Sequence, residues 1–369
     1  MPISFNQVPD WTSWENQGGN IAVADLDRDG APELIVVRVD NPGNGPNAGF
    51  YRVGKRLDAQ GNINGGWGPW IPIPNWMSNF NQGAGIAVAD FGPAGLALVV
   101  FQVQHLVPGP NKGLFSIGRG LDANGIVTGG WTNWTEVPNW ISWNDQGAAI
   151  TVTDVDGDGQ PDLVVFHIDD FHTDNPNLPN KGFYRVGSKL TSAGQVSSWT
   201  DWMQVDWFSW FNQGAGIALA DLDGNGRPEI IVFQIDNPPG ENGGFYRVGW
   251  NLDTQGRVQD GWGPWVRIDN WKSFEDQGGG FALASFGAGR PKAVVFHIQN
   301  PPGLNAGFFG VTDLVLDIDT AATKGVWRLL PYFSEVLPVH AAVLHTGKVL
   351  FFAASGNNRV RFFSNLFGS

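Results

Sequence analysis

Residues 207–236 read WFSWFNQGAGIALADLDGNGRPEIIVFQID and carry the pattern that decides the fold. An aromatic segment leads into Asn-Gln-Gly, an apolar run follows, and a loop of acids and glycines separates it from a second apolar run. Short apolar runs bounded by turn residues are typical of β-strands. The stretch therefore predicts a β-hairpin whose turn carries acidic side chains.

The same pattern occurs five times along the chain. The glutamine of the Asn-Gln-Gly-like tripeptide returns every 64 to 67 residues, as Gln17, Gln82, Gln146, Gln213 and Gln277. A tryptophan stands six residues before each glutamine, and a serine stands four residues before it. Self-similarity at a fixed period is the signature of a repeat architecture.

Each repeat predicts four short strands. In the fourth repeat these are the apolar run from Gly216, residues 229–236, the GFYRVG segment from Gly244 and the Trp-x-x-Trp segment from Trp262. Turn residues separate them. Four antiparallel strands per repeat describe one blade of a β-propeller.

The sequence predicts an all-β fold in one domain, residues 1–369: a six-bladed β-propeller of four-stranded antiparallel blades. The repeats span about residues 15–80, 81–143, 144–210, 211–274 and 275–335. The last blade is predicted to combine residues 336–369 with residues 1–14, because ISFNQVPDW at the N-terminus matches a fourth strand and its exit. Such a closure leaves no unpaired sheet edge.

The composition excludes several classes of partner and site. A net charge of −13 lacks the basic footprint of nucleic-acid binding, so no nucleic-acid partner is expected. The chain has no cysteine, which rules out disulfides, thiolate zinc sites and cysteine nucleophiles. No apolar run approaches roughly 18 residues, so membrane insertion is not expected.

The N-terminal sequence MPISFNQVPDW lacks the basic segment and the following apolar segment of a secretory leader. An extracellular and a cytoplasmic location both stay open, as does the oligomeric state.

Three repeats carry an acidic loop with the spacing D-x-D-x-[DN]-G followed by an acid at the ninth position. Ca²⁺ takes six to eight oxygen ligands, and this spacing supplies side chains at positions one, three, five and nine and a backbone carbonyl at position seven. The predicted ligands are Asp25, Asp27, Asp29, the Ala31 carbonyl and Glu33; Asp154, Asp156, Asp158, the Gln160 carbonyl and Asp162; and Asp221, Asp223, Asn225, the Arg227 carbonyl and Glu229. We expect about three structural Ca²⁺ ions, the alternative being an acidic hairpin without metal. The second and fifth repeats lack the acids.

The repeats with these loops resemble the FG-GAP or VCBS family of calcium-binding repeats, which is found in integrin-type propellers and in several propeller lectins. The resemblance covers roughly residues 15–310 and implies a propeller with calcium in its hairpins. The tail LPVHAAVLHTGKVLFFAASGNN, from Leu337, resembles the opening of the galactose-oxidase-like propeller family. The copper–radical enzymes of that family need a tyrosine crosslinked to a cysteine, so this activity is not implied here.

One face of the predicted propeller gathers aromatic and amide side chains. A sugar ring packs its C–H face on an indole and exchanges hydrogen bonds with amides, so we expect lectin-like binding of glycans through this repeated Trp/Asn/Gln-rich face. The candidate ligand residues are Trp14, Trp143, Trp210, Phe274, Asn47, Asn180 and Asn242. For the five tryptophans at the constant position and for the Trp-x-x-Trp pairs, packing between blades is the favoured interpretation.

Two further patterns concern charge and hydrogen bonding. Arg52, Arg185 and Arg247 occur in the same repeats as Asp40, Asp169 and Asp236, which predicts an ion pair within each of these blades. His167 and His297 occupy a strand position that holds glutamine in two other repeats. This alternation indicates a hydrogen-bonding position and not a general base.

The chain has no G-x-S-x-G elbow, no H-E-x-x-H helix and no phosphate loop, so it is predicted not to be an enzyme. Two alternatives to a lectin stay open. One is a protein-interaction or adhesion scaffold, and the other is a polysaccharide-acting enzyme with a base at an unrepeated position such as His340 or His172.

Overall fold

A computed structural model describes residues 3–11, 13, 18–40, 47–76, 78, 83–104, 111–140, 147–169, 180–209, 214–236, 242–271, 273, 278–287, 289–299, 305–316, 340–343 and 349–352. The chain divides into two compact units, Met1–Asp317 and Ile318–Ser369. All of the sites discussed below belong to the first unit.

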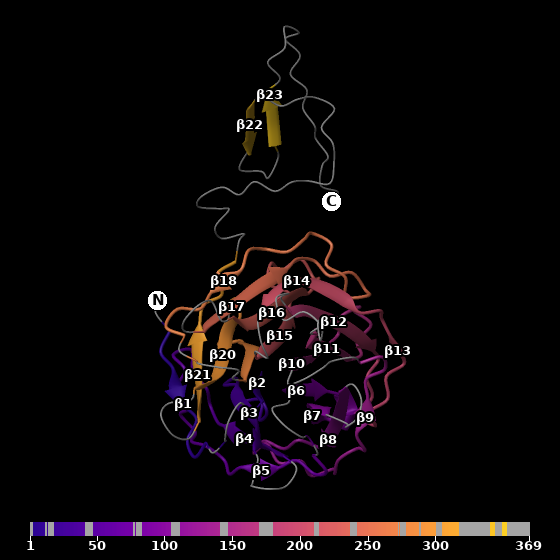
Figure 1. Ribbon diagram of the computed structural model, residues 1–369, viewed down its shortest axis with the longest axis vertical. Helices are drawn as coiled ribbons and strands as arrows, with labels where there is room; N and C mark the ends of the chain where they lie inside the picture. The colour runs from indigo at the N-terminus through magenta and orange to yellow at the C-terminus, as the bar shows by residue number, and fades with distance from the viewer. Residues whose placement is uncertain are drawn as a thin grey trace. The chain divides into compact units, whose positions relative to one another are not determined.

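The first unit is an all-β propeller, as predicted, and its described residues form five antiparallel blades of four strands each (Figure 1). Blades 1 and 2 contain β2 (Gly19–Ala24), β3 (Glu33–Asp40), β4 (Ala48–Gly54) and β5 (Ile71–Pro72), and β6 (Ala84–Asp90), β7 (Leu96–Gln104), β8 (Lys112–Arg119) and β9 (Thr135–Glu136). Blade 3 contains β10 (Ala148–Thr153), β11 (Asp162–Asp169) and β12 (Asn180–Ser188), with β13 (Ser198–Trp199) and β14 (Met203–Ser209) sharing the fourth position. Blade 4 contains β15 (Ala215–Ala220), β16 (Glu229–Asp236), β17 (Gly243–Gly249) and β18 (Val266–Arg267), and blade 5 contains β19 (Gly279–Ala284), β20 (Lys292–Gln299), β21 (Ala306–Thr312) and β1 (Asn6–Gln7).

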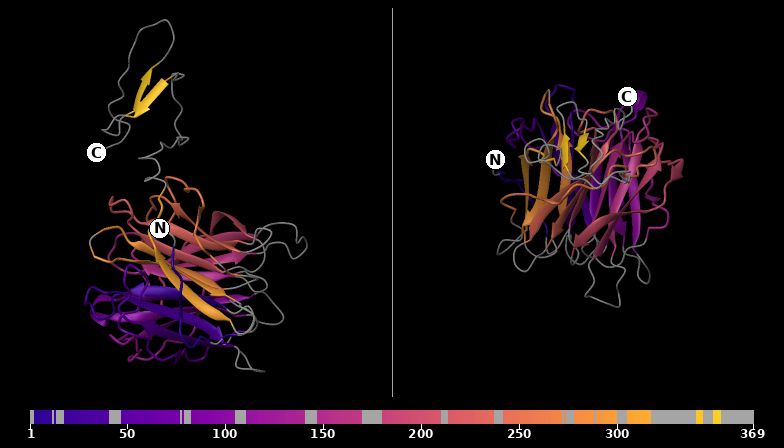
Figure 2. Two further views of the ribbon diagram at one scale, coloured as in Figure 1. Left: turned by 90° about the vertical axis from the view of Figure 1, so that its left-hand side faces the viewer. Right: turned by 90° about the horizontal axis from the view of Figure 1, so that it is seen from above.

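The number of blades corrects the sequence-based prediction of six. Strand β1 pairs with β21, with Asn6 opposite Phe309 and Gln7 opposite Phe308, and so it completes blade 5 (Figure 2). The prediction that the N-terminal strand joins the C-terminal residues in a sixth blade is therefore wrong. The physical reason is that residues 5–11, FNQVPDW, reproduce residues 70–76, WIPIPNW. Val8 N donates to Gly307 O at 2.8 Å in the same way that Ile73 N donates to Gly49 O at 2.8 Å.

The second unit contains one described hairpin. Strands β22 (His340–Val343) and β23 (Val349–Phe352) pair antiparallel. The other residues of the predicted closing segment 336–369 lie outside the described residues.

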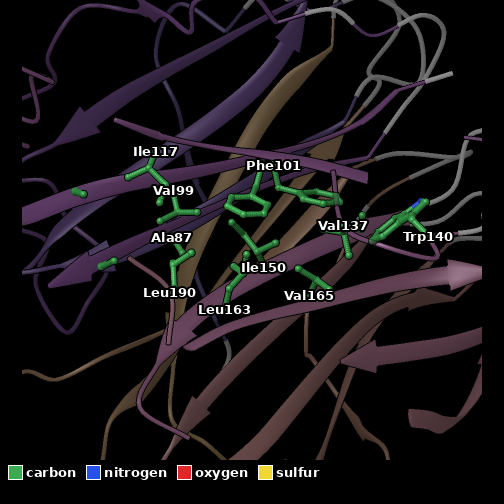
Figure 3. Packing of buried hydrophobic residues seen from close by; sticks show 14 of the residues in the cluster. Ala87, Val99, Phe101, Ile117, Val137, Trp140, Ile150, Leu163, Val165 and Leu190 are labelled. Atoms are coloured by element: carbon green, nitrogen blue, oxygen red, sulfur yellow. The ribbon is translucent and has the colours of Figure 1, made fainter. Parts of the chain in front are cut away.

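The core of the first unit lies between neighbouring blades. The second strand of each blade has a mostly apolar centre because both of its faces are covered; Leu34, Ile35 and Val36 of β3, for example, are 0% exposed. Figure 3 shows the layer between blades 2 and 3, where Val99 and Phe101 of β7 meet Ile150 of β10 and Val165 of β11. The ring therefore depends on contacts between blades.

The first strands surround the axis of the ring and leave a channel of about 170 Å³, lined by three successive residues of each first strand, such as Ile21 to Val23. At one end a single amide lies across the axis. Asn20 Nδ2 faces the carbonyl oxygens of Ala84, Ala148 and Ala215, in three other blades, at 3.2, 3.5 and 3.2 Å. The equivalent position in blade 5 is Gly280, where an added Cβ would lie 2.5 Å from Asn20 Oδ1.

Replacing this amide should weaken the ring. We expect Asn20→Ala to lower the free energy of unfolding by about 1–3 kcal/mol, because buried carbonyl groups of three blades lose their donor. Urea unfolding followed by tryptophan fluorescence measures the change. Asn133→Ala, at an exposed position of blade 2, is the matched control. Equal stability of the two variants would contradict a role for Asn20 at the axis.

Candidate metal and ligand sites

The three acidic loops connect the first and second strands of blades 1, 3 and 4. In each loop three carboxylates bring one oxygen apiece to within 4.8 Å of one another: Asp25, Asp27 and Asp29; Asp154, Asp156 and Asp162; Asp221, Asp223 and Glu229. The backbone folds around the first acid, since Asp25 Oδ2 accepts a hydrogen bond from Gly30 N at 2.9 Å and Asp221 Oδ2 accepts one from Gly226 N at 2.9 Å. The structure thus brings together three of the predicted acids in each loop, and the clusters do not include Glu33 of the first loop or Asp158 of the second.

The ninth-position acids lie beneath these loops. Glu33 is 1% exposed and accepts hydrogen bonds from Leu26 N at 2.8 Å and from Arg56 N at 3.3 Å. Asp162 and Glu229 make the equivalent bonds in their blades. Burial raises the pKa of each of these three acids, and the neighbouring aspartates raise it further. A divalent cation would supply the positive charge that these buried acids lack.

The residues at the fifth and seventh positions of the acidic loops form ion pairs and hydrogen bonds within the protein. Asp29 forms an ion pair with Arg56 at 3.4 Å, and Asp158 forms one with Lys189 at 2.7 Å. The Lys189 ammonium lowers the pKa of Asp158. Backbone N–H groups of the seventh-position residues Ala31, Gln160 and Arg227 each donate to the fifth-position side chain at 2.8 Å. Metal ligation by their carbonyl groups stays a prediction.

The donor set fits Ca²⁺. Each cluster offers hard carboxylate oxygens, with no imidazole or thiolate, and this chemistry favours calcium over zinc or copper. In blade 2 the equivalent loop is a 3₁₀ turn, Gly92–Ala94, whose Asp90 forms an exposed ion pair with Arg28 of blade 1 at 3.5 Å. The described part of the fifth loop also carries no acidic cluster.

The constant tryptophans are buried between blades, at 4 to 6% exposure, as the packing interpretation expects. Where the structure describes the serine two residues later, its hydroxyl oxygen accepts the indole N–H: Trp11 Nε1 lies 2.8 Å from Ser13 Oγ, Trp76 Nε1 lies 3.0 Å from Ser78 Oγ and Trp271 Nε1 lies 2.8 Å from Ser273 Oγ. The indole also covers the first glycine of the GFYRVG segment, since a Cβ added at Gly49 would lie 2.3 Å from the Trp76 ring. The Trp-x-Ser motif is thus explained by internal bonding.

The predicted ligand residues divide into two groups. Trp14, Trp143, Trp210 and Phe274 lie outside the described residues, as does the side chain of Asn180. Asn47 and Asn242 are 2% and 1% exposed, and their backbone N–H groups donate to Ser78 O and Ser273 O at 2.9 and 3.2 Å. These bonds join the Asn-x-Gly loops to the Trp-x-Ser segments, and ligand binding by the asparagines stays a prediction.

The predicted ion pair within blade 1 is wrong. Arg52 lies opposite Val36 whereas Asp40 lies opposite Ala48, so the two side chains stand far apart along the sheet. Asp40 pairs instead with Arg38, at 3.6 Å, and Arg52 pairs with Asp10, at 3.8 Å. The side chains of Asp169 and Asp236 lie outside the described residues.

The arginines of the GFYRVG segments have a different function from the predicted one. The Arg52 guanidinium lies 5.2 Å from the rings of both Trp67 and Trp70 and donates to Gly68 O, between them in sequence. Arg185 and Arg247 are held in the same way by Trp199 and Trp202 and by Trp262 and Trp265. In blades 1, 3 and 4 the Trp-x-x-Trp motif therefore holds an arginine through cation–π contacts, whereas in blade 2 the arginine position is Ser116.

One polar residue lies buried at the same position of each second strand, and aromatic rings surround it at Arg38, His167 and His297. The polar residues are Arg38, Gln102, His167, Gln234 and His297, and all are 2 to 6% exposed. Ring centroids of Trp140, Trp202 and Phe183 lie 4.7, 4.5 and 5.7 Å from that of His167. Rings of Phe5, Trp271 and Phe308 surround His297 at 4.7, 4.6 and 5.6 Å. We name these five positions the aromatic slots.

Several polar atoms in the aromatic slots lack a partner. Nδ1 of His167, Nδ1 of His297 and Oε1 of Gln234 are buried and have no hydrogen bond to any residue that the structure describes. Burial lowers the pKa of both histidines to about 3, so they stay neutral. The sequence pointed to hydrogen bonding at four of these positions and missed Arg38. The signal that would have found it is its alignment with Gln102 two residues before the end of the second strand.

The buried histidines predict a dependence of stability on pH. Because their folded-state pKa lies below the ordinary value of 6.5, only the unfolded chain takes up protons as the pH falls below 6.5, and stability is lost until about pH 3. Each histidine should contribute a loss of about 1.4 kcal/mol per pH unit in that range. The double variant His167→Gln, His297→Gln, which copies blades 2 and 4, should remove this slope. Urea midpoints at pH 7, 6 and 5 test it, and the same slope in both proteins would contradict it.

Comparisons with known proteins concern the fold. No protein-family model matches the sequence, and no curated protein matches it either. Among solved structures, a xylan β-1,4-xylosidase from Bacillus halodurans C-125 aligns at 11% identity and a TM-score of 0.46, over 84% of this chain and 55% of the xylosidase chain. An Aleuria aurantia lectin in complex with Fucα1-6GlcNAc aligns at 12% identity and a TM-score of 0.40, over 85% of this chain and 79% of the lectin. An α-L-arabinanase from Penicillium chrysogenum aligns at 9% identity and a TM-score of 0.43, over 85% of this chain and 97% of the arabinanase.

Because no family model matches, the resemblance to FG-GAP or VCBS calcium-binding repeats rests on the acidic loops alone. Among the described residues no helix has the length and apolar character needed to cross a membrane. The strand pairing itself shows that the described residues of the first unit form a β-propeller, and the aligned structures include both glycosidases and fucose-specific lectins.

Proposed function

We propose that this protein is a calcium-stabilised β-propeller that binds carbohydrate, in the manner of a lectin, without transforming it. The observation that supports this function is the aromatic slot, repeated around the ring. Three slots combine a half-buried ring with a buried polar group in contact: Trp70 with Arg38, Trp202 with His167 and Phe5 with His297. Gln102 and Gln234 hold the equivalent buried positions in blades 2 and 4. A sugar offers a C–H face to the ring and hydroxyl groups to the polar atom, and repetition of weak sites gives avidity.

The state of the histidines supports binding over proton transfer. A general base works best when its pKa lies near the working pH. His167 and His297, with pKa values of about 3 and aromatic rings packed beside them, are weak bases that can still donate and accept one hydrogen bond each.

The proposed role of calcium is structural. The acidic clusters follow the first strands, whereas the slot residues lie near the far end of the second strands, so the two kinds of site occupy opposite ends of a blade. Calcium would hold each hairpin through the loop acids and neutralise the buried acid below it. This role is the one that the resemblance to FG-GAP or VCBS repeats implies.

A glycan array in calcium-containing buffer, followed by titration calorimetry of the hits, tests the function. We expect binding that weakens at least tenfold in Gln234→Leu, which keeps the size of the side chain and removes its amide. Gln255→Leu, in an exposed turn of the same blade, should bind normally. An array without any bound glycan at millimolar concentration would contradict the proposal and favour a protein-interaction scaffold.

A further inference from the structure

One junction between blades differs from the other four. At two junctions the tyrosine of the third strand donates its hydroxyl to the turn between the third and fourth strands of the next blade: Tyr51 to Gly125 O at 3.0 Å and Tyr184 to Gly256 O at 2.8 Å. At a third junction Tyr246 donates to Val315 O at 3.2 Å, in the segment that follows β21 of blade 5. At the junction of blades 5 and 1, Asn6 Nδ2 donates to Gly61 O at 2.9 Å. Each of these segments is thus fixed by the preceding blade.

Between blades 2 and 3 the donor is missing. The residue at the tyrosine position is Phe115, which has no hydroxyl group and is 0% exposed. The turn itself is conserved in form, since Gly194 N donates to Thr191 O at 2.9 Å just as Gly125 N donates to Asp122 O at 2.8 Å. No side chain in the described part of the chain donates to Gly194 O. The Gly194 carbonyl oxygen is therefore free to accept a hydrogen bond from a bound ligand, whereas the equivalent carbonyl oxygens of Gly125 and Gly256 accept one from a tyrosine.

A cleft of about 580 Å³ opens at this junction. Its wall includes Phe115, Thr135, Thr191, Gly194, Gln195 and Trp199. This size falls within the range of about 300–1,000 Å³ that is typical of small-molecule sites. The lining residues Thr135 and Trp199 belong to β9 and β13, and Figure 1 shows these two strands at the outer edge of the ring.

The wall of the cleft differs in chemistry from the same positions elsewhere. Thr135 stands where the blades that keep the tyrosine have Ile71, Met203 and Val266, so an apolar side chain is replaced by a hydroxyl group. Thr191 stands where other turns have Asp58, Asp122 and Asp253, so a carboxylate is replaced by another hydroxyl group. None of the residues that line the cleft is charged. The site is neutral and rich in hydroxyl and amide groups.

We propose that this cleft is a single carbohydrate-binding site, separate from the five aromatic slots. The neutral wall gives no counter-charge for a phosphate or a carboxylate, and a charged ligand would lose its hydration there without compensation. A neutral pyranose offers hydroxyl donors to Gly194 O and a C–H face to the half-buried ring of Trp199. The chemical class of this ligand rests on the proposed function of the protein; the site itself rests on the missing hydroxyl and the cleft.

The variant Phe115→Tyr tests the site by restoring the hydroxyl that three other junctions have. Its new hydroxyl should donate to Gly194 O and take the place of the ligand's donor, with an unchanged or higher melting temperature. The matched control is Tyr184→Phe, which removes the hydroxyl at the next junction but leaves the apolar Met203 and the carboxylate of Asp253 in place. It should lose stability and gain no site.

The readout is the set of tryptophan indole N–H signals in nuclear magnetic resonance spectra, titrated with glucose, galactose, mannose, fucose and N-acetylglucosamine. The signal of Trp199, assigned through Trp199→Phe, should shift with at least one sugar in the native protein and at least tenfold less in Phe115→Tyr. The signals of Trp70, Trp134, Trp202 and Trp265 report the aromatic slots in the same spectra.

The outcomes separate the two proposals. Shifts at the slot tryptophans without a shift at Trp199 would overturn the cleft and leave the proposed function standing. A Trp199 shift that persists unchanged in Phe115→Tyr would also overturn the cleft. A Trp199 shift lost in Phe115→Tyr, with silent slot signals, would support the cleft and overturn binding through the slots. Spectra that no sugar changes would overturn both.

Discussion

Deletion of residues 1–9 is expected to unfold the propeller or to lower its melting temperature sharply. The deletion removes β1 from the edge of β21 and takes away Ile3 and Val8, which are 6% and 0% exposed. It also removes the Phe5 ring beside His297 and the Asn6 bond to Gly61 O. Loss of buried large apolar side chains costs about 2–5 kcal/mol each, and a domain is stable by only about 5–15 kcal/mol. Thermal unfolding followed by circular dichroism measures the loss.

Truncation after Asp317 is the matched control for this deletion. It removes the second unit but no strand of the five blades. We expect a change in the propeller's melting temperature of only a few degrees. If truncation at the C-terminus were as damaging as deletion at the N-terminus, closure of the ring within blade 5 would be contradicted.

Chelation of calcium is expected to lower the melting temperature by on the order of 10 °C. A ligand that binds only the folded state at 100 times its dissociation constant stabilises that state by about 2.7 kcal/mol per site, and three loops carry acidic clusters. Removal of the ion also leaves the buried acids Glu33, Asp162 and Glu229 beside other carboxylates without a counter-charge. Calorimetric scans with calcium and with a chelator measure the difference.

Single-site variants locate the ions. Asp25→Asn, Asp154→Asn and Asp221→Asn should each reduce the calcium stoichiometry by one, because the first acid faces the other carboxylates of its cluster. Asp90→Asn, at the same position in blade 2, should leave the stoichiometry unchanged. Scans that are identical with and without the chelator, and variants that bind as much calcium as the native protein, would overturn the metal sites.

The sequence predicted the blades well because their signals are local and repeated. Apolar runs, turn residues and a fixed period are enough to define four strands per blade, and the acidic spacing is enough to bring three carboxylates together. The number of blades depends on a contact between the two ends of the propeller. Residues 5–11 resemble every fourth strand equally, so the pattern alone did not show which third strand they pair with; the register of Asn6 on Phe309 decides it.

The errors and omissions at the sites have the same origin. Arg52 and Asp40 occur together in sequence, but strand register places them opposite different residues. The aromatic slots assemble rings from two blades and one polar group from a strand interior, as at His167 with Trp140 and Trp202. The cleft follows from the absence of one hydroxyl at Phe115, which is informative only after Tyr51 and Tyr184 are seen to reach the next blade.

The amide of Asn20 limits how alike the repeats can become. One side chain reaches three other blades across the axis, and the corresponding place in blade 5 has no room even for a methyl group. A gene assembled from five identical copies would therefore crowd five amides into a space that holds one, or leave the hole empty. The five repeats must therefore differ at this position for the ring to close. A designed propeller with five identical repeats would need a different set of side chains at its axis.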